Sequence, residues 1–301
     1  MEGFELVLKE LHIPFRTDRT LAELTTFKVG GPADLVLYPQ TVEQCAALIR
    51  YANETGRRLI YLGNGSNMLG EDGGCRDWIV KTDGLSELSV DEAGMMTVGA
   101  GVRTVKASSF AAKKSFSGLE FAHGIPGTIG GAIYMNAGAY GGTMDQIVLE
   151  TKYLNEKGEL CVLKAKDHGF GYRKSFFMEH PEYLIVGCRL QLTKGERDAI
   201  LATIQELQQR RKEKQPLEFA SAGSTFKRPE GYFAGKLIEN AGLKGYQIGD
   251  AQVSEKHAGF IINRGNATGD EVRQLIAYVR QKVKEHAGVE LECEVRSLGS
   301  N

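Results

Sequence analysis

Two glycine-rich segments of this 301-residue chain contain the residue types that bind phosphate groups. The first directly follows an apolar run and consists of Gly63, Asn64, Gly65, Ser66 and Asn67. The second covers residues 124–142. Glycine and asparagine tolerate a left-handed backbone, and successive exposed N–H groups form a concavity that binds anions. Both segments are therefore candidates to hold a pyrophosphate.

Neither segment has the spacing of an established nucleotide fingerprint. Residues 63–67 lack both the G-x-G-x-x-G pattern with its downstream acid and the Walker pattern G-x-x-x-x-G-K-S/T. By itself the first segment is equally typical of a tight turn without a ligand. Two such segments in one stretch are harder to explain as turns, because each ordered glycine costs folding entropy. Together they predict a large phosphate-bearing ligand.

Other kinds of site are not indicated by the sequence. Neither Ser66 nor Ser224 stands in the G-x-S-x-G elbow of a serine hydrolase, and no spaced His/Asp partners accompany them. Zinc-type Cys/His spacing is absent, so no metal site is predicted. An odd number of widely spread cysteines indicates reduced thiols rather than disulfides. They are Cys45, Cys75, Cys161, Cys188 and Cys293.

Composition narrows the class of protein further. Hydrophobic residues make up 42% and charged residues 25%, which is ordinary for a globular chain. The formal net charge is -1 with lysine and arginine dispersed, so a nucleic-acid partner is not expected. No apolar run approaches the roughly 20 residues of a membrane span, and the N-terminal residues do not resemble a secretory signal. We therefore expect a cytoplasmic protein without a membrane partner. A monomer is expected as the default, since the composition does not bear on the oligomeric state.

The elements that position the glycine-rich segments begin as an α/β unit. Residues 33–62 predict strand, helix and strand, with a capping box of Thr41 and Gln44 opening the helix. From about residue 83 the predicted segments are shorter and β-rich. The 124–142 segment holds too many glycines for a stable helix or central strand, and is too apolar for a disordered linker. We therefore predict a packed loop there.

The second half of the chain predicts a hairpin, two long helices and several strands. Two strands flank a turn at 156–158, and an alternating, half-buried strand follows at 182–192. A helix over 196–214 ends before Pro216, where we place a boundary. The remaining elements are a short helix around Leu237, a strand at 258–263, a helix opened by a capping box of Thr268 and Glu271, and a final strand at 289–298.

Six motifs, in order along nearly the whole chain, resemble those of one enzyme family. They are TTFKVGGPAD (25–34), LGNGSNML (62–69), GIPGTIGGAIYMNAGAYG (124–141), FGYRKSFF (170–177), SAGSTFKRP (221–229) and LECEVR (291–296). The set is similar to that of the UDP-N-acetylenolpyruvoylglucosamine reductases. This resemblance implies an α+β chain: an FAD-binding domain of the vanillyl-alcohol-oxidase (PCMH) type in two subdomains, then a C-terminal α+β substrate-binding domain. The implied ranges are 1–82 and 83–195 for the subdomains and 196–293 for the substrate domain, with a last strand at 294–301 that is a candidate to return to the first subdomain.

The resemblance also assigns both glycine-rich segments to FAD, held mostly through backbone groups around the pyrophosphate. The implied contacts are Gly63, Asn64, Gly65, Ser66, Asn67, Gly124, Pro126, Gly127, Thr128, Gly130, Gly131, Ala132, Asn136 and Gly138. His123, just before the second segment, is the one residue that suggests a covalent flavin attachment. Because the family binds FAD noncovalently, we interpret His123 as structural or as a hydrogen-bonding loop residue.

The reaction implied is the reduction of UDP-N-acetylglucosamine enolpyruvate to UDP-N-acetylmuramate by NADPH through FAD, in peptidoglycan precursor synthesis. Hydride addition to the enolpyruvyl double bond pushes negative charge onto its carboxylate, which a cation or hydrogen-bond donor must stabilise. Arg173 resembles the family's catalytic arginine, and Glu294 resembles the acid that shares this task. Ser224 resembles the residue that protonates the other carbon.

Taken without the resemblance, each of these residues has a simpler interpretation. Arg173 would be a surface arginine and Ser224 a turn or cap serine. Alternation along the final strand places Glu290, Glu292 and Glu294 on one face and does not choose among them. Only the LECEVR motif selects Glu294.

Three further residues are candidates for substrate binding: Tyr172, Lys214 and Asn240. Lys214 could pair with the diphosphate, although the residue alone also fits a solvated lysine at a frayed helix end. The short connection after FGYRKSFF resembles the class of the family that lacks a tyrosine-bearing loop over the nucleotide. Cys293 departs from the family, which commonly has proline there.

Two other functions share part of this pattern. Another FAD-dependent oxidoreductase of the same fold, acting on a small alcohol or sugar, would use the two FAD segments but would not need Arg173, Ser224 and Glu294 in these motifs. A non-catalytic nucleotide-binding module would need only the glycine-rich segments. The sequence therefore favours the enolpyruvate reductase.

Overall fold

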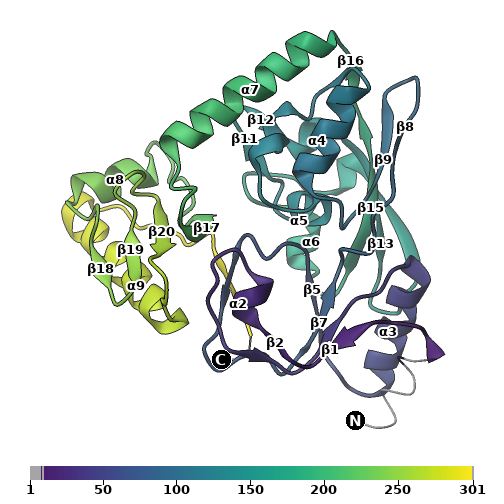
Figure 1. Ribbon diagram of the computed structural model, residues 1–301, viewed down its shortest axis with the longest axis horizontal. Helices are drawn as coiled ribbons and strands as arrows, with labels where there is room; N and C mark the ends of the chain where they lie inside the picture. The colour runs from purple at the N-terminus through teal and green to yellow at the C-terminus, as the bar shows by residue number, and fades with distance from the viewer. Residues whose placement is uncertain (1–7, 9, 300–301) are drawn as a thin grey trace. The chain divides into compact units, whose positions relative to one another are not determined.

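The computed structural model describes residue 8 and residues 10–299, which form two compact units (Figure 1). Each unit is assembled from separate stretches of chain. The first unit contains the described residues up to Arg16, Leu35–Asn64 and Trp78–Arg210. The second unit contains Thr17–Asp34, Gly65–Asp77 and the described residues from Arg211 onward.

The predicted division into 1–82, 83–195 and 196–293 has different boundaries from these units. Residues 17–34 and 65–77 group with the C-terminal part, because Phe27, Val29 and Leu69 share its hydrophobic core. The division into two flavin subdomains and a substrate domain stays a prediction.

Two sheets form the framework of the first unit. The strands of the smaller sheet are β1 (Phe15–Arg16), β4 (Val36–Leu37), β5 (Leu59–Leu62) and β7 (Trp78–Lys81). They lie in the order β1-β4-β7-β5, with β4, β7 and β5 parallel. The strands of the larger sheet are β8 (Leu88–Val90), β9 (Met95–Gly99), β13 (Val148–Leu154), β14 (Leu160–Lys164) and β15 (Leu184–Gln191). This sheet is antiparallel, in the order β14-β13-β15-β9-β8.

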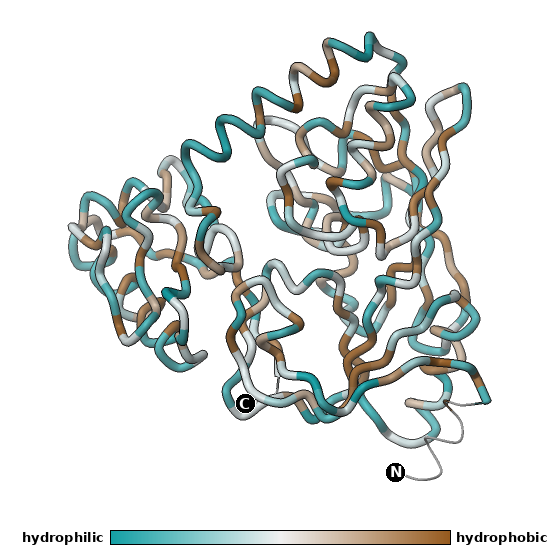
Figure 2. Tube along the Cα trace, in the orientation of Figure 1, coloured by the Kyte–Doolittle hydropathy of each residue, from teal (hydrophilic) through white to brown (hydrophobic). Residues whose placement is uncertain are grey.

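Helices and short strands complete the first unit. The helices are α3 (Val42–Glu54), η1 (Glu120–Gly124), α4 (Thr104–Lys113), α5 (Ile129–Tyr134), η2 (Met144–Gln146), η3 (Ala165–Asp167) and α6 (Phe176–Glu179). The short pairs are β10 (Phe116–Ser117) with β16 (Thr193–Lys194), and β11 (Gly138–Ala139) with β12 (Gly142–Thr143). Helix α7 (Arg197–Lys214) begins in this unit and ends in the other, and Figure 2 shows that its second half is hydrophilic.

A four-stranded sheet and one long helix form the framework of the second unit. Its elements are β2 (Arg19–Thr20), α2 (Leu21–Leu24), β3 (Pro32–Ala33), β6 (Met68–Gly70), β17 (Ala220–Ser224), α8 (Ala234–Asn240), β18 (Gln247–Ile248), β19 (Ala251–Val253), β20 (Phe260–Asn263), α9 (Gly269–Ala287) and β21 (Arg296–Leu298). The sheet order is β17-β20-β19-β18, and β2 pairs with β3. The last strand, β21, runs parallel to β6, so it does return to a segment from the first part of the chain.

The capping predictions differ in their outcome. At the start of α9, Thr268 and Glu271 form the full reciprocal box that the sequence predicts. At the start of α3, Thr41 accepts from the amide of Gln44, but the Gln44 side chain instead accepts from the amide of Gln40. Only half of that box is present.

Three other segments correct the sequence prediction. The glycine-rich 124–142 segment includes helix α5, because Thr128 caps it and Gly130 lets its backbone approach Ala100 closely. Strand β15 is the centre of its sheet and is almost wholly buried rather than half-buried. The final strand covers only Arg296–Leu298, so strand alternation does not apply to Glu290, Glu292 and Glu294. Within the described residues, the segment 290–294 forms one isolated antiparallel bridge, between Cys293 and Phe226.

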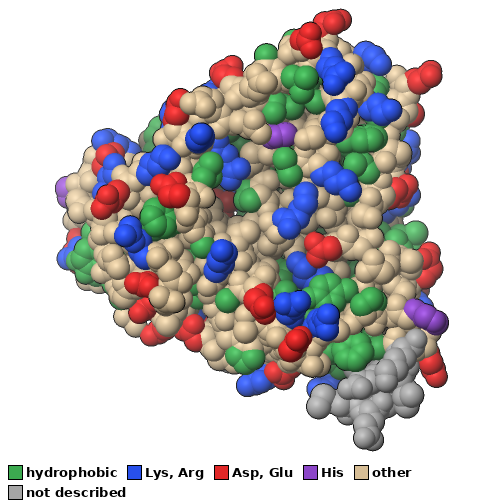
Figure 3. All heavy atoms as spheres, in the orientation of Figure 1, with side chains coloured by type: hydrophobic (Ala, Val, Ile, Leu, Met, Phe, Trp, Pro, Cys, Tyr) green, Lys and Arg blue, Asp and Glu red, His purple; other side chains and the backbone are tan. Residues whose placement is uncertain are grey.

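Charged side chains of both signs are interspersed on the face of the molecule that Figure 3 shows. Acidic and basic residues number 38 and 37, so this mixture is what the near-zero net charge leads one to expect. On that face neither sign gathers into one extended patch.

Candidate active site

The first glycine-rich segment directly follows β5, and contacts fix its backbone at Gly63 and at Gly65. The buried Lys81 ammonium group on β7 donates to the carbonyl oxygen of Gly63 and lies 3.3 Å from Asp83. Burial lowers the pKa of Lys81, because it disfavours the charged form. Gly65 has a φ of 63°, and a Cβ there would collide with the carbonyl oxygen of Leu24. Glycine is therefore required at this position by conformation and by space.

The two glycine-rich segments meet in the first unit. A Cβ on Gly63 would collide with Thr128 Oγ1, so the Thr128 side chain packs directly on the backbone of Gly63. The Asn64 side chain donates to the carbonyl oxygen of Pro126. Thr128 in turn accepts from the amide of Gly131 at 3.4 Å and caps α5. Residues predicted to contact one ligand thus come from adjoining loops.

A buried nitrogen lies at the start of the second segment. His123 Nδ1 has no hydrogen-bond partner among the residues that the structure describes. Burial also lowers the pKa of His123, which keeps the ring neutral at physiological pH. An unsatisfied buried polar atom costs roughly 1–3 kcal/mol, so a ligand with a complementary polar group would be stabilised there. Together with the adjoining loops, this atom fits a bound flavin nucleotide.

Arg173 lies at the tip of a tight hairpin. Gly171 and Lys174 exchange two backbone hydrogen bonds of 3.1 and 3.2 Å, which leaves Tyr172 and Arg173 as the turn residues. Arg173 has a φ of 52°, which is uncommon for a residue other than glycine. Its Nη2 donates to the carbonyl oxygen of Gly138 at 3.5 Å, and its guanidinium carbon lies 5.3 Å from the centre of the Tyr172 ring. The structure therefore brings together Arg173, Tyr172 and the second glycine-rich segment.

Ser224 and Glu294 lie on paired segments of the second unit. Ser224 is exposed at the end of β17, opposite Phe260 on β20. The amide of Glu294 donates to the carbonyl oxygen of Thr225 at 2.8 Å. The carbonyl oxygen of Glu294 accepts from Asn67 Nδ2 at 3.0 Å. The predicted serine, the predicted glutamate and the end of the first glycine-rich segment are thus joined within one unit.

The backbone around Cys293 explains why cysteine can replace the family's usual proline. Cys293 lies opposite Phe226 in an antiparallel bridge. The flanking hydrogen bonds are donated by the amides of Lys227 and Glu294, and neither uses the amide of Cys293. A proline, which has no N–H, would therefore fit the same pairing. Burial raises the pKa of the Cys293 thiol, so the thiol remains protonated at neutral pH.

Two of the predicted substrate residues are at helix ends. Lys214 is the last residue of α7 and Asn240 the last of α8, and both are exposed. They belong to the second unit, as the serine and the glutamate do, whereas Arg173 and Tyr172 belong to the first. The roles of all six residues remain predictions.

Sequence reasoning missed His168, a buried residue shortly before the Arg173 hairpin. This fully buried ring has Nδ1 2.8 Å from the carbonyl oxygen of Lys164 and Nε2 2.7 Å from Thr151 Oγ1. It also stacks on Phe170, with ring centres 4.5 Å apart. Both nitrogens are satisfied if the neutral ring donates from Nδ1 and accepts at Nε2. The one available signal in the sequence is the position of His168 just before FGYRKSFF.

We expect His168 to make stability depend on pH in the mildly acidic range. Burial lowers its pKa in the folded protein, so the unfolded chain binds this proton more readily. The contribution of neutral His168 to the free energy of unfolding is thus fully present above about pH 6.5 and falls as the pH decreases below it. His168→Gln should be less stable by about 1–3 kcal/mol at neutral pH, with a smaller deficit at acidic pH.

Urea unfolding of the parental protein and of His168→Gln, each at neutral and at acidic pH, measures this difference. His286→Gln, at an exposed histidine of α9, is the control and should keep the parental free energy of unfolding at neutral pH. A deficit for His168→Gln that stays constant with pH would contradict the assignment.

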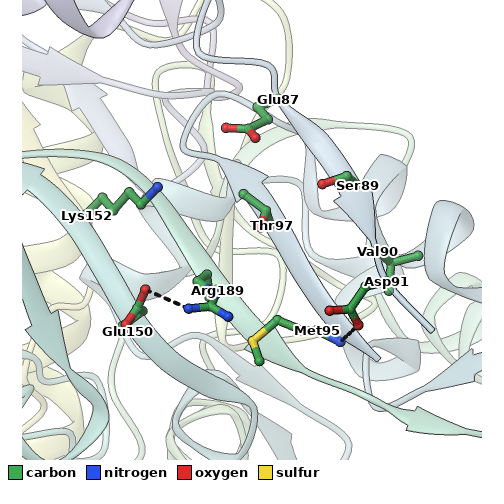
Figure 4. A pocket seen from close by; sticks show the side chains of 9 residues that line it. All are labelled: Glu87, Ser89, Val90, Asp91, Met95, Thr97, Glu150, Lys152 and Arg189. Carbon is green, nitrogen blue, oxygen red and sulfur yellow. Dashed lines mark hydrogen bonds and ion pairs between the residues drawn. The ribbon is translucent and has the colours of Figure 1, made fainter. Parts of the chain in front are cut away.

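A separate pocket on the larger sheet of the first unit contains none of the predicted site residues. Figure 4 shows its lining: Glu87, Ser89, Val90, Asp91, Met95, Thr97, Glu150, Lys152 and Arg189. The nearly buried Glu150 accepts hydrogen bonds from Lys164 and, at 3.4 Å, from Arg189. The hydrogen bond from Lys164 is the main reason that the pKa of Glu150 is lowered. These charges tie strands β13, β14 and β15 together.

Comparison with known proteins gives matches along most of the chain. Residues 33–164 match the family model for an FAD binding domain, and residues 215–298 match that for the UDP-N-acetylenolpyruvoylglucosamine reductase C-terminal domain. The UDP-N-acetylenolpyruvoylglucosamine reductase of Lachnoclostridium phytofermentans is 45% identical, over 98% of this chain and 97% of that protein. That of Clostridium kluyveri is 42% identical, over 100% and 99%. The crystal structure of UDP-N-acetylenolpyruvylglucosamine reductase from Thermus caldophilus has a TM-score of 0.80 and 34% identity, covering 95% of this chain and 98% of that one.

Fold and matches together define a flavoprotein reductase, with an FAD-binding domain followed by a reductase C-terminal domain. The predicted fold class is confirmed. The chain belongs to the UDP-N-acetylenolpyruvoylglucosamine reductase family, as the six motifs predicted. In the part of the chain that the structure describes, no helix is long and apolar enough to cross a membrane, and no cluster of His, Cys, Asp or Glu could hold a metal ion.

Proposed function

We propose that this protein reduces UDP-N-acetylglucosamine enolpyruvate to UDP-N-acetylmuramate, with NADPH as reductant and noncovalent FAD as carrier. The reaction serves peptidoglycan precursor synthesis, and we propose a monomeric cytoplasmic enzyme. The observation that carries this proposal is the match of almost the whole chain to reductases of one family.

The FAD site is proposed to comprise the glycine-rich segments 63–67 and 124–138. The close packing of Thr128 on Gly63 and the buried Nδ1 of His123 support this assignment, because they bring the two segments together beside an unsatisfied polar atom. When bound, FAD supplies hydride transfer from NADPH to the enolpyruvyl carbon. The protein's own groups bind and orient the ligands and stabilise the charge that develops on the substrate.

Three residues are proposed to act on the substrate. Arg173 stabilises the carboxylate as hydride addition makes it more negative, since a planar guanidinium can bind both oxygens. Glu294 assists Arg173 in stabilising the same developing charge. The hydroxyl of Ser224 gives its proton to the neighbouring carbon, which completes the addition of one hydride and one proton across the double bond. Solvent then returns a proton to Ser224.

Tyr172, Lys214 and Asn240 are proposed to bind the rest of the substrate, with Lys214 at the diphosphate. We assign the chain to the class without a tyrosine-bearing loop. In support, the Arg173 hairpin has only two tip residues, and α6 is followed closely by β15.

An anaerobic absorbance experiment on the purified protein tests the proposed function. NADPH should bleach the flavin band at about 450 nm, and the enolpyruvyl substrate should restore it. Bleaching without restoration would favour another FAD-dependent oxidoreductase of the same fold. A protein that takes up no FAD would contradict the proposal altogether. Running the same cycle with NADH tests the choice of reductant.

A further inference from the structure

Asn136 lies within the second glycine-rich segment, and both ends of its side-chain amide contact protein backbone. The residue is only 4% exposed and has a φ of 41°. Its Nδ2 donates to the carbonyl oxygen of Gly171 at 3.0 Å, and its Oδ1 accepts from the amide of Asp145 at 3.0 Å. Gly171 is the first residue of the hairpin that presents Arg173. The side chain thus links the glycine-rich segment to the base of that hairpin.

A second contact holds the other side of the hairpin. Ser175, fully buried, donates from its hydroxyl to the carbonyl oxygen of Tyr134 on α5 at 2.7 Å. The hairpin is therefore attached to the same segment both before and after Arg173. A residue in a left-handed conformation, as Arg173 is, keeps that conformation only when its surroundings fix it.

We propose that Asn136 is a positioning residue for Arg173: its amide holds the hairpin on the segment proposed to bind FAD. The inference rests on the proposed function, in which Arg173 meets the substrate carboxylate. This role replaces the cofactor contact proposed for Asn136, and the other proposed FAD contacts of the segment are unaffected. Asparagine suits this position because it tolerates φ > 0 and offers a donor and an acceptor on one short side chain.

The variant Asn136→Asp separates the two roles. Aspartate tolerates the left-handed conformation and keeps an acceptor for the amide of Asp145, but it places an oxygen against the carbonyl of Gly171. The rate of flavin reoxidation by the enolpyruvyl substrate should fall about 10- to 100-fold, because small displacements of a catalytic group are costly. The dissociation constant for FAD and the rate of flavin reduction by NADPH should both stay near the parental values.

A double-mutant cycle with Arg173→Ala tests whether Asn136 acts through Arg173. In the Arg173→Ala background, Asn136→Asp should cause almost no further loss of reoxidation rate. The matched control is Gln146→Glu, in which the acid keeps the acceptor for the amide of Thr143 and loses the donor to the carbonyl of Gly141. This variant should reoxidise at the parental rate.

Two results would overturn the inference. One is a raised FAD dissociation constant for Asn136→Asp with an unchanged reoxidation rate, which would make Asn136 a cofactor ligand. The other is a loss that adds fully to that of Arg173→Ala. If thermal unfolding shows that Asn136→Asp does not fold, Ser175→Ala takes its place in the cycle with the same expectation. Failure of the proposed function is distinguishable, because the parental protein itself would then not be reoxidised by the enolpyruvyl substrate.

Discussion

Replacing Arg173 with alanine is expected to slow flavin reoxidation by the enolpyruvyl substrate by about 10²- to 10³-fold, the usual cost of losing a group that stabilises developing charge. Flavin reduction by NADPH should keep its rate, because that step creates no charge on the substrate carboxylate. Anaerobic stopped-flow absorbance measures the two half-reactions separately. Arg173→Lys should recover only part of the rate, since an ammonium group cannot bind both carboxylate oxygens in the planar manner of guanidinium.

The neighbouring residue provides the control for this prediction. Lys174 lies in the same hairpin, is exposed, and pairs with Glu179 at 3.0 Å. Lys174→Ala therefore removes a positive charge next to Arg173 without removing the proposed catalytic group. Equal losses for the two variants would mean that net charge, rather than the Arg173 guanidinium, governs the step.

The second large effect is expected for Ser224→Ala. Removing the proposed proton donor should lower the rate of substrate reduction by about 10²- to 10⁴-fold, the usual contribution of a positioned acid. Binding of FAD should not change, because Ser224 is outside both glycine-rich segments. The measurement is the single-turnover yield of UDP-N-acetylmuramate after reduction of the flavin by NADPH.

A serine on the same strand serves as the control. Among the residues that the structure describes, the hydroxyl of Ser221 takes part in one long hydrogen bond, accepted from the amide of Gly223 at 3.5 Å. Ser221→Ala should therefore retain the parental rate. If Ser224→Ala left both flavin reduction and reoxidation unchanged, the proposed proton transfer would be wrong.

Local signals in the sequence predicted much of the fold. The capping box of Thr268 and Glu271 marked the start of α9, and the turn ending at Gly158 marked the hairpin between β13 and β14. The errors in secondary structure arose where tertiary contacts, rather than local sequence, determine the element that forms. Helix α5 forms in a glycine-rich segment because Thr128 caps it and Gly130 packs on Ala100. No local sequence pattern predicts the packing of Gly130 on Ala100.

The candidate site shows the same division between local and long-range information. The motif resemblance proposes Arg173, Ser224 and Glu294 as site residues, but it does not predict which contacts hold them. Asn67 contacts the carbonyl of Glu294 across 227 positions of sequence, and Asn136 contacts the hairpin of Arg173 across 35. These supports depend on the folded chain, so composition and periodicity could not predict them.

The pairing of β21 with β6 bears on how the protein is made. Strand β6 emerges from the ribosome early in synthesis. Its parallel partner β21, residues Arg296–Leu298, is synthesised more than 200 residues later. Phe27, Val29 and Leu69 likewise share their core with side chains from residues 222–291. Until those residues are synthesised, these early apolar segments lack their native partners, a state that invites aggregation or chaperone binding. A polypeptide limited to residues 215–298 would lack the same partners, so we expect that the C-terminal domain does not fold by itself.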